Sequence, residues 1–107
     1  MSVVRGTTPT ISLTFSATKY PQLDLTTASV VLVTFTSGIK KVTKQGDDLV
    51  IGARSIGVFL NQRDTLQFDK TAEMQANWLT ADGKRCSTKA ISFEIDKQLE
   101  DRVISVD

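Results

Sequence analysis

The chain has 107 residues, of which 40% are hydrophobic and 23% are charged, and its formal net charge is +1. This length fits one domain with one core, so we expect residues 1–107 to fold as a single domain without metal or disulfide staples. A balance so close to neutral gives no electrostatic basis for binding nucleic acid or an anionic membrane, and we predict neither as a partner.

The single cysteine, Cys86, cannot form an intrachain disulfide. Because small secreted β domains often carry one, we expect the chain to fold in a reducing cytoplasm. The first residues lack the apolar stretch of a signal peptide. The longest apolar run, residues 30–33, is far shorter than the roughly 20 residues that span a bilayer. These patterns predict a soluble chain without a membrane anchor.

The first part of the chain shows strand patterns separated by turns. Apolar and polar residues alternate over residues 11–15, which predicts a strand with one buried face. A loop is expected over residues 19–22. Residues 29–36 are the most β-prone segment, and apolar residues on both of its faces predict a position inside a sheet. A tight turn at residues 37–38 then leads to a shorter, lysine-rich strand over residues 39–43.

The middle of the chain continues in the same way. A turn over residues 46–48 leads into a strand at residues 49–51, and alternation resumes over residues 56–60. Residues 61–70 form a polar crossover with at most one helical turn, near residues 62–65. Its two large apolar residues are expected to fill the core: Leu66 and Phe68.

The next segment, residues 72–79, fits both a helical stripe and an alternating strand. We favour the strand, because residues 81–84, Ala-Asp-Gly-Lys, are a hairpin turn signal. The returning strand is expected over residues 85–95, with Ile91, Phe93 and Ile95 facing inward. Its alternation is out of phase before that point, and a bulge near residues 89–90 would correct the phase.

Short strands punctuated about every 8–12 residues predict an all-β fold. We expect an immunoglobulin-like β-sandwich of about seven or eight antiparallel strands. Residues 96–107 are expected to be a polar C-terminal tail or an edge element. Two alternatives remain open for Trp78, which could be the central core aromatic or a half-exposed anchor.

The residues that usually carry chemistry are sparse. The chain has no histidine, so it lacks the Ser-His-Asp and Cys-His arrangements and the commonest transition-metal ligand. Cys86 has no CxxC partner and is interpreted as a structural thiol. The acidic pairs at residues 47–48 and 100–101 are adjacent in sequence, and neighbours in a strand point to opposite faces. We therefore predict no enzymatic activity, no catalytic residue, no cofactor and no metal.

Charged residues offer the candidates for interaction. The basic ones fall into two groups: Lys40, Lys41 and Lys44, and Lys84, Arg85 and Lys89. Lysines on strands are usually solvated and protect sheet edges, and neither Trp78 nor Tyr20 interleaves with these groups. Our predicted interaction residues flank the expected hairpin tips: Asp47, Asp48, Lys84 and Arg85.

Five motifs taken together resemble a known family. They are RGTTPTI at 5–11, LDLT at 23–26, GDDL at 46–49, LNQRDTL at 60–66 and WLTADG at 78–83. Their order resembles small β-sandwich proteins encoded by tailed phages and prophages of Gram-positive bacteria. It is also similar to the N-terminal immunoglobulin-like domain of phage baseplate upper proteins. The resemblance spans roughly residues 5–95.

The resemblance implies a virion structural or assembly protein of the baseplate or tail type, folded in the host cytoplasm and located in the virion. Its partners would be other virion structural proteins, reached by protein–protein contacts, and we expect a homo-oligomer. The alternative is a stand-alone module that binds carbohydrate or a cell-surface ligand. One tryptophan and one tyrosine give that alternative few aromatic residues to use.

Overall fold

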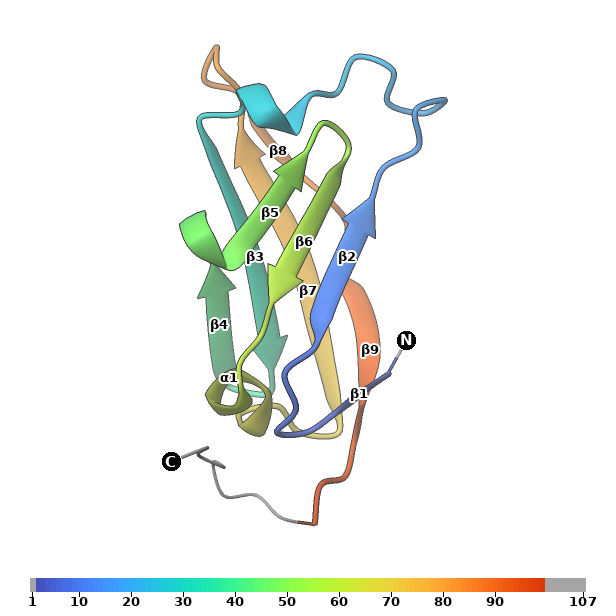
Figure 1. Cartoon of the computed structure of the whole chain (residues 1–107), viewed down its shortest axis with the longest axis vertical. Coiled ribbons are helices and arrows are strands. Elements are labelled where there is room, and N and C mark those ends of the chain that lie inside the picture. Colours follow the sequence, from blue (N-terminus) through green and yellow to red (C-terminus); the bar gives the residue numbers. More distant parts are fainter. Residues whose placement is uncertain (1, 100–107) are drawn as a thin grey trace.

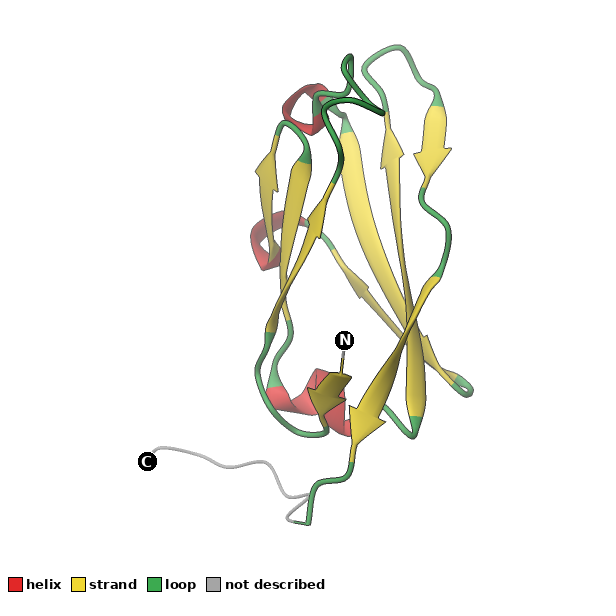
Figure 2. Cartoon of the chain, turned by 90° about the vertical axis from the view of Figure 1, so that its right-hand side faces the viewer, coloured by secondary structure: helices red, strands yellow, loops and turns green. Residues whose placement is uncertain are grey.

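The computed structural model describes residues 2–99, which form two β-sheets packed face to face (Figures 1 and 2). The larger sheet has the strand order β1-β9-β7-β3-β4, with β8 also paired to β7, and the smaller sheet has the order β2-β6-β5. The strands are β1 (Ser2–Val4), β2 (Thr10–Thr14), β3 (Val30–Ser37), β4 (Lys40–Lys44), β5 (Leu49–Gly52), β6 (Ser55–Phe59), β7 (Thr71–Leu79), β8 (Arg85–Ser87) and β9 (Ile91–Asp96). The helical elements are η1 (Leu25–Thr27), η2 (Gly46–Asp48) and α1 (Gln62–Leu66).

This topology confirms the predicted all-β sandwich and its immunoglobulin-like character. Strands β3, β7 and β9 share one sheet, as strands C, F and G do in immunoglobulin domains, and β4 extends it as in the variable type. Strands β2, β6 and β5 take the places of B, E and D. The expectation of antiparallel strands alone is wrong at one pair, because β1 runs parallel to β9.

The core lies between the two inner faces and consists of the residues that alternation places inward. Phe35 and Val33 on β3 and Ala76 on β7 are fully buried. Phe35, Phe68 and Phe93 form a ring cluster with centroids 5.9–6.3 Å apart. Phe68 comes from the crossover after α1, as expected, whereas Leu66 is only half-buried.

The segment that fitted both a helix and a strand is the strand β7. The strand that returns along β7 is divided near residues 89–90, where a bulge was expected. Its first part, β8, pairs with residues 77–79, and its second part, β9, pairs with residues 71–74. Between them, the Thr88 hydroxyl accepts the backbone N–H of Ala76 at 3.1 Å, which maintains the connection to β7. The inward prediction is confirmed for Phe93 and Ile95. Ile91 lies on the same face, opposite the buried Met74, but it borders an open groove and is 40% exposed.

Lys44 does not belong to a solvated basic surface, and that expectation is wrong. It alternates with the buried Val42 and therefore points inward, where its Nζ lies 2.6 Å from Oδ2 of Asp64. Asp64 also accepts the backbone N–H of Asn61, and the Asn61 side chain accepts the backbone N–H of Asp64. This reciprocal capping box begins α1 and holds the carboxylate under β4.

The predicted tail, residues 96–107, starts one residue too early, because Asp96 still pairs with Val4 of β1. The adjacent strand β1 was not expected, since three residues are too few to show a period. Residues 100–107, including the acidic pair at 100–101, lie outside the described residues. In the part of the chain that the structure describes, no helix has the length and apolarity to cross a membrane.

Candidate interaction site

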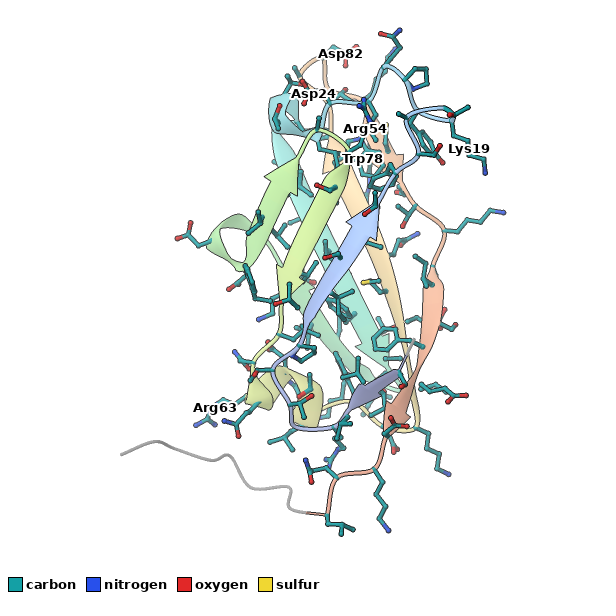
Figure 3. The ribbon with its side chains drawn as sticks, turned by 45° about the vertical axis from the view of Figure 1, so that its right-hand side comes forward. Lys19, Asp24, Arg54, Arg63, Trp78 and Asp82 are labelled. Carbon is teal, nitrogen blue, oxygen red and sulfur yellow. The ribbon has the colours of Figure 1, made fainter. Side chains whose placement is uncertain are left out.

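A groove of about 1040 Å³ opens on one side of the sandwich, between the end of β2 in the small sheet and β8 and β9 in the large sheet. Strand β1 pairs with β9 opposite residues 94–96, toward the other end of the molecule. Figure 3 shows Trp78 and Lys19 at the groove end of the molecule, with Arg63 of α1 at the opposite end. The groove therefore lies on the part of the open side that β1 leaves uncovered.

Three aromatic side chains line this groove, and we call it the aromatic groove after Phe15, Tyr20 and Trp78. The Phe15 ring stands edge-to-face to Trp78, with centroids 5.6 Å apart, and to Tyr20, at 5.7 Å. Such pairs add about 0.5–1.5 kcal/mol each beyond the area they bury. Of the two alternatives left open for Trp78, the structure shows the half-buried anchor.

Each aromatic residue is positioned by local sequence. Phe15 continues the inward phase of Ile11 and Leu13 just past β2, and its N–H donates to the Arg54 carbonyl at 2.8 Å. Trp78 continues the inward phase of β7. Tyr20 comes from the following loop, where its N–H donates to the Ser16 carbonyl at 2.8 Å.

The remaining lining is apolar or weakly polar, with two cations. Cys86 pairs with Trp78 across β7 and β8 and is half-buried, which agrees with its interpretation as a structural thiol. Lys19 and Lys89 lie at the exposed rim, and none of the described lining residues is acidic. The groove thus offers apolar rings surrounded by hydroxyl groups and positive charge.

One border of the groove is the edge of β2, with which no other strand pairs within the described residues 2–99. Pro9 accepts from the N–H of Leu60 and Phe15 donates to Arg54, so the odd-numbered residues of β2 bond to β6. In an antiparallel pair, the alternate residues, here the even-numbered ones, direct their N–H and C=O groups away from the partner strand. The backbone groups of Thr10, Ser12 and Thr14 therefore point outward along the edge of the small sheet.

The structure does not bring the predicted interaction residues together. Asp47 and Asp48 lie on η2, beside β4 and β5, whereas Lys84 and Arg85 lie in the β7–β8 hairpin at the upper end in Figure 1. All four are exposed, as expected. The prediction that Asp47 and Asp48 flank a hairpin tip is wrong, because the strands on either side of them, β4 and β5, belong to different sheets. The role of the four residues in binding stays a prediction.

Sequence reasoning missed the aromatic groove. It separated Trp78 and Tyr20 from the basic residues, but Lys89 shares their groove and lies away from the hairpin tip. The available signal was the pair Phe15 and Tyr20, just beyond a strand whose inward phase Phe15 continues. Within residues 2–99, no three side chains of the metal-binding types gather closely enough to hold a metal ion.

No family model and no curated protein matches this sequence. Among solved structures, the chain is similar to murine CRIg, with 16% identity, 92% of this chain and 91% of that chain covered, and a TM-score of 0.41. A likeness this weak says nothing about what the chain binds.

Proposed function

We propose that this chain is a non-enzymatic structural or assembly module of a phage or prophage particle, of the baseplate or tail type, that acts by protein–protein contacts. The observation that carries the proposal is the aromatic groove. Tryptophan and tyrosine are over-represented among the residues that dominate binding energy at protein interfaces. Here, both side chains share one groove beside the outer edge of β2, which pairs only with β6 in the described part of the chain.

The chemistry of the groove supports contact rather than reaction. General acid–base catalysis needs a proton donor and acceptor within reach of one substrate atom. The described lining combines aromatic rings and hydroxyl groups with the two rim lysines, and it supplies no carboxylate. Lys19 and Lys89 favour a partner segment that carries apolar residues next to acidic ones.

Trp78→Ala is expected to reduce incorporation into particles about tenfold or more, because truncating a buried aromatic anchor at an interface typically costs about 2 kcal/mol or more. The phage of the source genome is induced while a tagged chain is produced, and particles are purified on a density gradient. The tag is then quantified in the particle fraction. Wild-type chain should be found there in a fixed ratio to the other particle proteins.

Leu79→Ala is the matched control for this experiment. Leu79 is the next residue on β7, is 36% exposed and lies on the opposite face of the sheet. Its truncation should leave incorporation unchanged, and circular dichroism should show both variants folded. Wild-type chain that is abundant in the lysate but absent from purified particles would reject the virion role.

A second candidate function is a module that binds carbohydrate or a cell-surface ligand. The specific observation in its favour is that Tyr20 and Trp78, the only residues of their types, are brought into one groove. Titration with purified cell-wall glycans tests it. Saturable binding that Trp78→Ala abolishes and Leu79→Ala preserves would favour this candidate over the virion role.

A further inference from the structure

We propose that two copies of this chain associate through the free edge of β2, so that their small sheets join into one continuous sheet across a twofold axis. This association does not depend on the proposed virion role, since it is argued from the backbone and charge pattern of one strand. The occupant of the edge is β2 of a second copy, running antiparallel and centred on Ser12.

Strand β2 lacks charged side chains of the kind that edge strand β4 carries. Exposed strand edges are usually guarded by charged side chains, which oppose pairing with other chains. Lys40 and Lys41 lie on edge strand β4, and Asp47 and Asp48 directly precede edge strand β5. By contrast, no charged residue occurs between Arg5 and Lys19, a stretch that contains all of β2.

The outer edge of β2 is complementary to itself. In a twofold contact, each residue meets the same or a symmetry-related residue, so a central charge would face a like charge. Centred on Ser12, the pairing places Ser12 opposite Ser12 of the second copy, and Thr10 opposite Thr14. The outward N–H and C=O groups of these three residues then form about six hydrogen bonds, and threonine pairs across strands add to the stability.

The inner face of β2 is apolar. Ile11 and Leu13 point toward the core side, and Leu13 also lines the aromatic groove. In the paired sheet, Ile11 of one copy lies opposite Leu13 of the other, about 5 Å away across the strands. The contact thereby continues the apolar layer of each sandwich into its neighbour, at the margin of the aromatic groove.

Analytical ultracentrifugation of the purified chain over a wide concentration range tests the proposal. Wild type is expected to be a dimer that dissociates on dilution. Ser12→Lys places two like charges on the twofold axis and should weaken dimerisation at least tenfold. Val50→Lys adds the same charge to the outer face of β5, where Val50 is 58% exposed, and should leave the dimer unchanged.

A double variant tests the register itself. Thr10→Lys combined with Thr14→Glu places each lysine opposite a glutamate of the second copy, so the dimer should persist or become tighter. Hydrogen exchange provides a second readout, because pairing should slow the amides of Thr10, Ser12 and Thr14 in the dimer.

Three results would overturn the proposal. These are a wild-type chain that stays monomeric at every concentration, a dimer that Ser12→Lys leaves intact, and a dimer that Val50→Lys weakens equally. A monomer whose three β2 amides become protected only when another protein is added would assign the edge to that protein instead of a second copy.

Discussion

Replacing Asp64 by alanine is expected to lower the free energy of unfolding by about 3–5 kcal/mol, because the change leaves a buried ammonium group without its partner. Lys44 Nζ lies 2.6 Å from Asp64 Oδ2, and the two side chains are 10% and 11% exposed. Asp64 also closes the capping box with Asn61, so the same change removes a cap from α1. Urea unfolding, followed by the fluorescence of Trp78, measures the loss.

Two further variants separate charge burial from other effects. Lys44→Met combined with Asp64→Ala removes both charges and should recover most of the stability, leaving a deficit of about 1 kcal/mol for the lost cap. Lys84→Ala breaks the ion pair with Asp82, in which the side chains are 80% and 67% exposed, and should cost less than about 1 kcal/mol. An Asp64→Ala variant no less stable than Lys84→Ala would mean that the buried pair does not hold α1 against β4.

The sandwich could be predicted because period-two alternation is a local property of the sequence. It placed β2, β3, β6 and β7 close to their observed bounds, and the Ala-Asp-Gly-Lys turn decided in favour of β7 over a helix. The phase mismatch in the returning strand likewise predicted a bulge near residues 89–90, and the pairing with β7 shifts by one residue between β8 and β9. Strand β1 gave no such signal, since its parallel pairing with β9 is long-range.

The features that define the candidate site depend on which strand ends meet in space. The inward position of Lys44 was readable from its alternation with Val42, but its partner, Asp64, is supplied by a crossover from the other sheet. The aromatic groove likewise requires the end of β2 to lie across from the β7–β8 pair. Sequence spacing alone gives neither the distance from Lys44 to Asp64 nor the distance from β2 to the β7–β8 pair. The sequence therefore indicates a solvated Lys44 and aromatic residues that lie apart.

Phe35→Ala should be comparably destabilising, by about 3–5 kcal/mol, because truncating a fully buried aromatic ring leaves a cavity that rigid neighbours fill only in part. Phe35 lies on β3, and its ring centroid is 5.9 Å from that of Phe68 and 6.2 Å from that of Phe93. The ring therefore connects the middle of the large sheet with the crossover and with β9. Its loss removes the ring contacts to Phe68 and Phe93 at once.

Phe59→Ala provides the matched control, since it is the same change on a strand of the other sheet. Phe59 is 44% exposed and should cost less than about 1 kcal/mol. Phe35→Leu keeps much of the apolar volume and should lie between the two, so the series remains measurable even if Phe35→Ala does not fold. The three variants are compared by urea unfolding. Equal losses for Phe35→Leu and Phe59→Ala would show that the phenylalanine cluster does not dominate the core, and that the two sheets are held together mainly by their aliphatic residues.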